Sequence, residues 1–271
     1  MAEGSERDVI ASIERGFAVL LAFDADLPAP SLAEVATKTG LSRPAVRRIL
    51  LTLQKLGYVN ASGSRWSLTP RVLTIGQHYA ASHAISEVAQ PHLLRLAELT
   101  HESASLSQLD GTGVVYVARV HVRRVMSLNV DIGSRVPVHA TSMGRVLVAW
   151  ADASVIEQVI EDGLPALTPT TVTDPVAFRD ALHEVRQQGF ALVDGELEPG
   201  FLSAAAPVRN PAGDVVAALA YSTSRGRTDV QHVLDDVVPH LLDVAASIQR
   251  DLAVVTTGRR TLAPGARDGF F

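Results

Sequence analysis

Two consecutive helix signals separated by one glycine constrain the fold of this chain most tightly. The stretch "SLAEVATKTG" begins with Ser31 and Glu34 at capping-box spacing and ends at Gly40, where a left-handed C-cap stops a helix. Ser42 then supplies a second N-cap, and Pro44 suits the first turn of the helix that follows. The buried stripe of this second helix consists of Val46, Ile49, Leu50 and Leu53. The sequence therefore predicts two short helices joined by a tight turn.

The flanking segments complete a winged helix-turn-helix pattern. Residues 7–23 carry apolar side chains at helical spacing, so we expect a first helix there. Gly57 ends the second helix of the pair, and "YVNASGSRWSL" predicts two short strands around a turn at residues 61–64. The order of helices, turn and hairpin predicts a winged helix-turn-helix domain over residues 1–68.

Positive charge is concentrated in the same part of the chain. The whole chain has a net charge of −5, yet no acidic residue occurs between Glu34 and Glu87. That window carries +7 and leaves −12 for the rest; its basic residues are Lys38, Arg43, Arg47, Arg48, Lys55, Arg65 and Arg71. Such segregation is typical of a nucleic-acid-binding module joined to an acidic domain, although a solvated basic surface would show it too.

The second helix of the pair is the expected DNA reader. Its arginines project away from the buried stripe, and a guanidinium can bind guanine O6 and N7 or a phosphate in the major groove. The hairpin tip is placed to contact the flanking backbone or minor groove. The residues predicted to contact double-stranded DNA are Ser42, Arg43, Arg47, Arg48, Ser64 and Arg65.

A connecting helix is expected over residues 69–84. Thr69 and Pro70 open it, and Val72, Ile75 and Tyr79 share one side. This apolar side needs a partner, either the second domain or the same helix of another subunit. A homodimer, or a dimer of dimers, is what a reader of symmetric DNA half-sites requires.

From residue 85 onward the sequence carries alternating helix and strand patterns typical of a larger domain. Helical patterns are expected at residues 88–101, 141–152, 174–189 and 228–252. Strand patterns are expected at residues 104–110, 114–120, 125–130, 190–193, 202–210 and 214–224. One antiparallel sheet with helices beside it predicts an α+β, sensor-like domain over residues 85–255. Residues 256–271 lack periodicity, and we expect a flexible tail there.

Several classes of protein are excluded by what the sequence lacks. It contains no phosphate loop, dinucleotide-binding glycine pattern, HExxH or GxSxG motif, so we expect neither an enzyme nor a bound cofactor. The absence of cysteine excludes disulfides and thiolate-ligated metals and suits the cytoplasm. No apolar run is long enough for a membrane helix, and no signal peptide is evident, so we expect no membrane association. A lone histidine such as His139 is more often structural than a metal ligand.

Other interpretations remain open, and two of them concern the loop "DGELEPG". Its carboxylates, those of Asp194, Glu196 and Glu198, could perform acid–base chemistry or hold a cation, although no partner nucleophile is visible. A small-molecule enzyme built around Asp194 and Glu196 is therefore one alternative, and a polar loop between two strands is another. An adaptor that uses a winged helix without binding DNA is a third.

The segment "GSRVPVHATSMGRVLVA" contains a better candidate for binding a ligand. A helix begins there with Thr141, Ser142, Met143 and Gly144 in its first turn. A helix N-terminus lined by hydroxyls and a glycine suits a carboxylate, because its N–H groups lack intrahelical acceptors. Met143 adds an adaptable apolar wall. By itself the signal is modest, since every capped helix shares part of it.

The chain resembles the IclR family of bacterial transcriptional regulators from about residue 10 to residue 252. The segments that carry the resemblance are "SIERGFAVLLAF", "TGLSRPAVRRILLTLQKLGYV", "LTPRVLTIG", "VVYVAR", "GSRVPVHATSMGRVLVA" and "DGELEPGFLSAAAPV". The resemblance implies a winged helix that binds operator DNA, a GAF-like effector domain, and a dimer or dimer of dimers. The pairing of "RRILLTLQKLGYV" with "TSMGRVL" resembles the branch that controls β-ketoadipate pathway genes, whose effectors are aromatic acids or their ring-cleavage products.

The resemblance also implies an effector site. It places effector contacts at Ser142, Met143, Asp194, Ser203 and Ser222. Ala220 stands where some members have a hydroxyl, and Ser203 stands where some have a cysteine. Both departures count against a small oxyacid effector of the glyoxylate kind. Arg135 or Arg119 could pair with an aromatic carboxylate, and either could equally be a surface arginine; we take Arg135 as the effector-site candidate.

Overall fold

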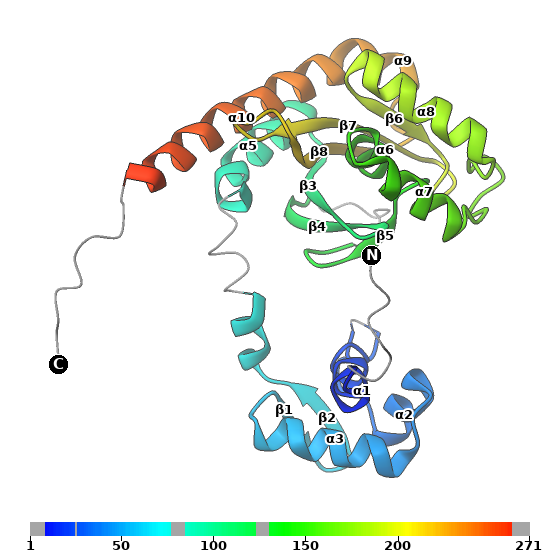
Figure 1. Cartoon of the computed structure of the whole chain (residues 1–271), viewed down its shortest axis with the longest axis vertical. Helices are drawn as coiled ribbons and strands as arrows, with labels where there is room; N and C mark the ends of the chain where they lie inside the picture. The colour runs from blue at the N-terminus through cyan, green and yellow to red at the C-terminus, as the bar shows by residue number, and fades with distance from the viewer. Residues whose placement is uncertain (1–8, 25, 77–84, 123–129, 262–271) are drawn as a thin grey trace. The chain divides into compact units, whose positions relative to one another are not determined.

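The computed structural model describes residues 9–24, 26–76, 85–122 and 130–261, with side chains to residue 255. The chain forms two compact units, Met1–Ser82 and His83–Phe271, and each is described by itself (Figure 1). No helix in these described ranges is both long and apolar enough to cross a membrane.

The N-terminal unit is a winged helix-turn-helix, as the sequence predicts. Its elements are α1 (Ala11–Leu20), α2 (Leu32–Thr39), α3 (Arg43–Lys55), β1 (Val59–Ser62) and β2 (Arg65–Leu68). The capping box forms, because the Ser31 hydroxyl accepts from the Glu34 N–H and the Glu34 carboxylate accepts from the Ser31 N–H. Gly40 ends α2 with a φ of +68°. The fully buried centre of this unit comprises Val19, Val46, Leu50 and Val59.

Part of the expected connecting helix lies within the described residues. A short 3₁₀ turn, η2 (Pro70–Val72), begins at Thr69, whose hydroxyl accepts from the Arg71 N–H, and residues 73–76 continue as helix. The rest of the expected connector, residues 77–84 with Tyr79, lies outside the described residues.

The C-terminal unit is built on one six-stranded antiparallel sheet with the order β5-β4-β3-β8-β7-β6. Its strands are β3 (Ser103–Asp110), β4 (Gly113–Val120), β5 (Arg135–Pro137), β6 (Ala191–Asp194), β7 (Phe201–Arg209) and β8 (Val215–Ser224). Its helices are α5 (Ile85–Thr100), α6 (Ser142–Ala149), α7 (Ala153–Glu161), α8 (Pro175–Gln188), α9 (Val230–His232) and α10 (Val238–Thr261). The predicted α+β class and antiparallel sheet are confirmed.

The two faces of the sheet carry separate apolar cores. Leucines of α5 and α10 pack on one face against Leu106, Leu202 and Leu219. Helices α6, α7 and α8 pack on the other face, and Figure 1 shows the two groups on opposite sides of the strands. Because side chains alternate along a strand, Ser203 and Ala205 of β7 lie on the α6 face.

Three details differ from the sequence-based expectation. Helix α7 and strand β5 were not expected, and most of the strand predicted at 125–130 lies outside the described residues. The single helix expected at 228–252 consists of α9, a π-helical turn η3 (Val233–Val237) and α10. Pro239 follows that turn and cannot donate a backbone hydrogen bond to the turn before it, which suits a widened helix there. Helix continues to Thr261, so 256–261 are helical, and residues 262–271 of the expected tail lie outside the described residues.

Candidate DNA-binding and effector-binding sites

Helix α3 presents its basic side to solvent. Val46, Leu50 and Leu53 are its buried residues, so the helical period leaves Arg43, Arg47 and Arg48 exposed. The Ser42 hydroxyl accepts from the Ala45 N–H at 3.4 Å, which caps the helix.

Within the acid-free window, the positive charge without an ionic or aromatic partner among the described residues lies on α3. Of the seven basic residues in the acid-free window, Lys38 pairs with Asp24, Arg65 pairs with Glu34, and Arg71 lies 5.5 Å from the centre of the Tyr58 ring. Among the described residues, the other four make no ion pair; they are Arg43, Arg47, Arg48 and Lys55. These four residues are exposed, and all belong to one helix. This arrangement is suited to a polyanion.

The wing is braced against α2. Gly63, with a φ of +59°, begins the two-residue hairpin loop, and Ser64 at its tip is exposed. Arg65 Nη1 lies 2.8 Å from Glu34 Oε2 and donates to Ala29 O at 3.2 Å. Arg65 therefore holds the hairpin to the capping box of α2, whereas Ser64 has no such attachment among the described residues.

Helix α6 lies buried at the centre of the C-terminal unit. All eight of its residues are buried, including Met143 at 3% exposure. The Thr141 hydroxyl caps the helix by accepting from the Gly144 N–H at 3.1 Å. A Cβ at Gly144 would lie 2.2 Å from Val138 O, so only glycine permits this approach.

The N-terminus of α6 meets the sheet at a pair of buried serines. Ser142 Oγ donates to Ser203 Oγ of β7 at 3.0 Å, although the two residues are 61 positions apart. Ser222 of β8 lies directly opposite Ser203 in the strand register. Within the described part of the chain, the N–H groups of Ser142 and Met143 have no acceptor. Two buried donors therefore stand beside two hydroxyls.

The loop after β6 is tied down by two ion pairs. Asp194 Oδ2 lies 3.4 Å from Arg225 Nε. Glu196 is buried, and its Oε2 lies 2.6 Å from Arg145 Nη2 and accepts from the Val172 N–H at 2.9 Å. Both carboxylates are thus already paired, and Glu198 is exposed. The alternative of an acid–base catalyst around Asp194 and Glu196 is not supported by this geometry.

The two candidate arginines lie on different faces of the sheet. Val136 packs in the α6-side core, so its neighbour Arg135 faces away, where it is exposed and pairs with Asp110. Arg119 lies opposite Ser105 on β3, whose side chain lies on the α6 face. The structure therefore brings together Ser142, Met143, Ser203 and Ser222 but places Arg135 elsewhere.

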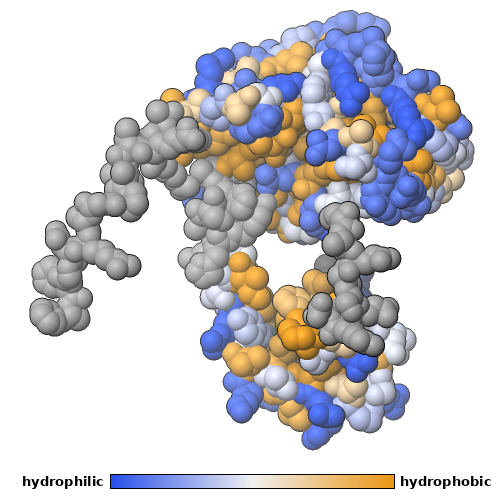
Figure 2. Space-filling view, in the orientation of Figure 1, coloured by the Kyte–Doolittle hydropathy of each residue, from blue (hydrophilic) through white to orange (hydrophobic). Residues whose placement is uncertain are grey.

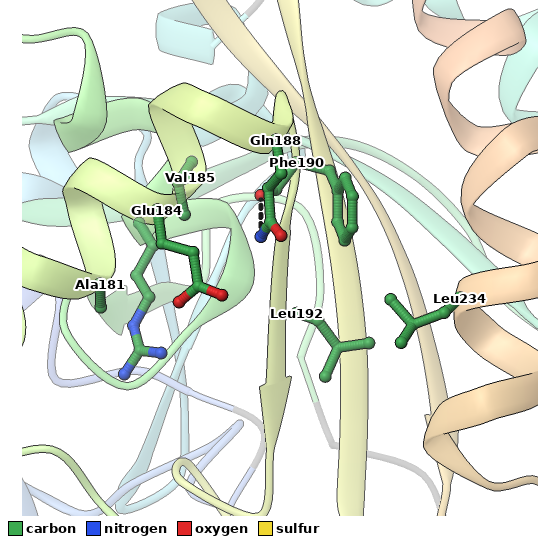
Figure 3. Close-up of a pocket in the computed structure, with 8 residues that line it drawn as sticks. Ala181, Glu184, Val185, Gln188, Phe190, Leu192 and Leu234 are labelled. Carbon is green, nitrogen blue, oxygen red and sulfur yellow. Dashed lines mark hydrogen bonds between the residues drawn. The ribbon is translucent and has the colours of Figure 1, made fainter.

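A separate pocket of about 210 Å³ opens at the β6 edge of the sheet (Figure 3). It is lined by Arg145, Ala181, Glu184, Val185, Gln188, Phe190, Leu192 and Leu234. Figure 3 shows Leu192 and Leu234 facing each other, with the Gln188 amide bonded to Phe190 O. None of the predicted effector residues lines it, and the Arg145 guanidinium is already engaged by Glu196. This pocket therefore offers no free cation to a carboxylate.

Burial perturbs three titratable groups on the α6 face. Burial raises the pKa of Tyr116 to about 12 and lowers the pKa of Arg119. Burial also lowers the pKa of His139, whose Nε2 lies 3.0 Å from Pro165 O. In the described ranges, no group of three acidic or histidine side chains is placed to hold a metal ion.

Sequence reasoning missed the buried pair of Arg145 and Glu196 and the buried serines of β3. A single arginine in the otherwise apolar run "MGRVLVA" was a signal that a buried partner exists. The alternation of serine in "SASLS", at residues 103, 105 and 107, was a signal for a polar sheet face.

The first unit has an exposed basic helix and a wing, and the second unit has buried N–H donors at a helix N-terminus. Together these features define a ligand-responsive transcriptional regulator. The model of the IclR helix-turn-helix domain matches residues 12–63, and that of the bacterial transcriptional regulator IclR C-terminal region matches residues 77–250. This chain belongs to the IclR family of transcriptional regulators and, as predicted, is not an enzyme.

Similar proteins agree with the predicted branch of the family. The chain is 40% identical to the Pca regulon regulatory protein of Pseudomonas putida, over 90% of this chain and 84% of that protein. It is 38% identical to the p-hydroxybenzoate hydroxylase transcriptional activator of Acinetobacter baylyi, over 89% of this chain and 92% of that protein. An IclR homolog from Microbacterium hydrocarbonoxydans, complexed with 4-hydroxybenzoate, superposes with a TM-score of 0.79 at 26% identity, over 89% of this chain and 98% of that one.

Proposed function

We propose that this regulator controls genes for the breakdown of aromatic acids and senses an aromatic acid or a ring-cleavage product. The observation that carries the proposal is the pair of buried N–H groups of Ser142 and Met143 beside the hydroxyls of Ser142 and Ser203. A carboxylate supplies the acceptors that these donors lack. Relatives named for the Pca regulon and for p-hydroxybenzoate hydroxylase support the same effector class.

The effector site comprises Ser142, Met143, Ser203 and Ser222. Asp194 ends β6 next to Ser203 in the register, since Val193 lies opposite Ser203. Asp194 itself lies opposite Leu202, whose side chain packs in the core on the other face of the sheet, so the Asp194 carboxylate points away from the α6 N-terminus and pairs with Arg225. Arg135 takes no part, because it faces the other side of the sheet and pairs with Asp110.

Calorimetric titration tests the effector site. The ligands are 4-hydroxybenzoate, protocatechuate, β-ketoadipate and glyoxylate. We expect an aromatic acid or β-ketoadipate to bind wild type and to bind Ser142→Ala and Ser203→Ala at least tenfold more weakly. Ser154→Ala, at an exposed serine of α7, is the matched control. Binding that is unchanged in Ser142→Ala and Ser203→Ala would contradict the proposed site.

Operator binding is assigned to Ser42, Arg43, Arg47 and Arg48, with Ser64 and Arg65 on the wing. The four basic residues of α3 have no ion-pair partner among the described residues. If Arg47 makes a bidentate base contact, Arg47→Ala should cost about 1 to 3 kcal/mol of binding and reduce discrimination between sequences. Arg15→Ala removes the same charge from exposed α1 and is the control in gel shifts. An adaptor that does not bind DNA would show no salt-dependent binding to any duplex.

A homodimer, or a dimer of dimers, is supported by the apolar surface of the N-terminal unit. Helix α1 and the connector expose Ile10, Ile13, Phe17, Leu21 and Leu73 at 53% to 76% of their surface. Figure 2 shows hydrophobic residues reaching the surface of this unit among hydrophilic ones. A second copy would bury them and supply the second half-site reader. We also infer that the protein acts in the cytoplasm, where its DNA is.

A further inference from the structure

The α6 face of the sheet has a floor of small side chains. The register aligns Ser103, Ser105 and Ser107 of β3 with Ser222, Ala220 and Ala218 of β8, and Ser203 and Ala205 of β7 continue the same rows. Serine and alanine are small, so this floor takes up less volume than larger side chains would. The proposed effector site occupies one end of this floor, at Ser203 and Ser222.

Ser107 stands farther along the same floor with an unsatisfied hydroxyl. Its side chain is 0% exposed, and its Oγ has no hydrogen-bond partner among the described residues. Ser107 lies between Tyr116 of β4 and Ala218 of β8, and both of these residues belong to the α6-side core. Buried polar atoms in folded proteins nearly always have partners, so the unpaired Ser107 hydroxyl is a candidate for binding a ligand.

Arg119 borders the same floor opposite Ser105, one row from Ser107, and its Nε lacks an acceptor among the described residues. Its Nη1 donates to Val130 O and its Nη2 lies 3.4 Å from His121 Nδ1, while its Nε is buried without a partner in the described structure. The guanidinium lies 5.9 Å from the centre of the Tyr116 ring, and no carboxylate in the described part of the chain forms an ion pair with it. A half-buried guanidinium that has an unpaired Nε and no carboxylate partner is suited to an anion or another oxygen acceptor.

We infer that Ser107 and Arg119 bind the far end of the effector. This inference rests on the proposed function, because the near end is the carboxylate held at α6. The far end must carry an oxygen acceptor, since the Arg119 guanidinium can only donate, while the Ser107 hydroxyl can donate or accept. The effector is therefore a small acid with oxygen at both ends, either a hydroxybenzoate or a dicarboxylate from ring cleavage. An acid with one polar end leaves both groups unpaired and binds more weakly.

Matched pairs of ligands test this inference by calorimetry on the full chain. 4-Hydroxybenzoate is compared with benzoate, and adipate with hexanoate, so each pair differs only at the far end. Wild type should prefer the two-ended member of at least one pair by tenfold or more. A larger preference within the adipate pair identifies a dicarboxylate, and a larger preference within the benzoate pair identifies a hydroxybenzoate.

Variants at the two ends separate the inference from the proposed function. Ser107→Ala should reduce the preference within the pair at least fivefold, with the affinity for the one-ended acid unchanged. Ser142→Ala should weaken both members of a pair by the same factor. Arg119→Met repeats the same comparison of ligand pairs at the cation. Ser107→Ala removes only an unpaired atom, so its thermal unfolding should match that of wild type and thereby confirm that the fold persists.

The outcomes are distinct. If wild type has no preference within either pair, or if Ser107→Ala and Arg119→Met weaken both members equally, the far-end assignment is overturned and the carboxylate site at α6 stands. If wild type binds none of the four acids, the far-end inference is overturned, and the titration with protocatechuate and β-ketoadipate decides separately whether the proposed effector class stands.

Discussion

Breaking the buried ion pair of Arg145 and Glu196 should destabilise the C-terminal unit strongly. The two side chains are 8% and 9% exposed, and their charged atoms lie 2.6 Å apart. Arg145→Met leaves the Glu196 carboxylate buried with only the Val172 N–H as donor, and Glu196→Gln leaves the guanidinium with His139 O. Removing one member of a buried pair costs about 3 to 5 kcal/mol, because the remaining charge stays desolvated. We expect each single change to lower the free energy of unfolding by about that amount.

The double variant distinguishes a coupled pair from two independent losses. Arg145→Met with Glu196→Gln removes both charges, so no uncompensated ion remains. The double variant should lose less free energy of unfolding than the sum of the losses in the two single variants, by about 2 kcal/mol or more. Additivity within about 0.5 kcal/mol, or single costs below about 1 kcal/mol, would refute the reasoning.

Tryptophan fluorescence during urea unfolding measures these costs on the full chain. The sequence has two tryptophans, Trp66 in β2 and Trp150 after α6. In a Trp66→Phe background Trp150 alone reports on the C-terminal unit, where the Arg209 guanidinium lies 4.8 Å from the centre of its ring. Arg179→Met, at an exposed pair with Glu157, is the control and should cost less than about 1 kcal/mol.

Three further predictions concern packing, pH and the wing. Gly144→Ala puts a Cβ 2.5 Å from the Val138 Cα and should cost about 3 kcal/mol or more in the same unfolding assay; a cost below about 1 kcal/mol would mean that α6 can shift freely. Because burial lowers the pKa of His139, the unfolded chain binds more protons there, so stability should fall as the pH drops below the ordinary histidine value of about 6.5 toward the lower folded value. His139→Gln should flatten that slope between pH 7.5 and 5.5, and an unchanged slope would assign it to other groups. Arg65→Met should weaken operator binding less in gel shifts than the loss of an α3 arginine, because Glu34 shares the Arg65 guanidinium; an equal loss would mean that Arg65 contacts the operator as strongly as the α3 arginines do.

The DNA-binding unit could be predicted almost completely because its signals are local. The capping box of Ser31 and Glu34, the glycine at residue 40 and the N-cap at Ser42 each act over a few residues, and all three form as predicted. Local signals also predicted α8, which begins at Asp174 and ends at Gly189. Helix α7 was missed because it follows Ala151 and Asp152 without a separate turn signal.

The effector unit could be predicted as a class but not as a site. Helical and alternating patterns in the sequence determined an antiparallel sheet flanked by helices, and resemblance identified the α6 N-terminus. The contact of Ser142 with Ser203, however, joins two elements separated by 61 positions. Likewise, no local pattern shows that Glu196 is buried against Arg145.

Strand register decided which arginine lies on the same face of the sheet as the proposed effector site. Side chains alternate between the two faces of a strand, so a shift of one residue exchanges them. The β3–β4 register shifts between Leu106 and Ser107, and this places Arg119 on the α6 face, whereas the pairing of β5 places Arg135 on the other face.

The sequence by itself determined the elements, their order and the separation of charge, because capping, periodicity and composition act along the chain. Only the tertiary structure decided which polar groups are buried together and which lack a partner, because both depend on pairing between distant strands.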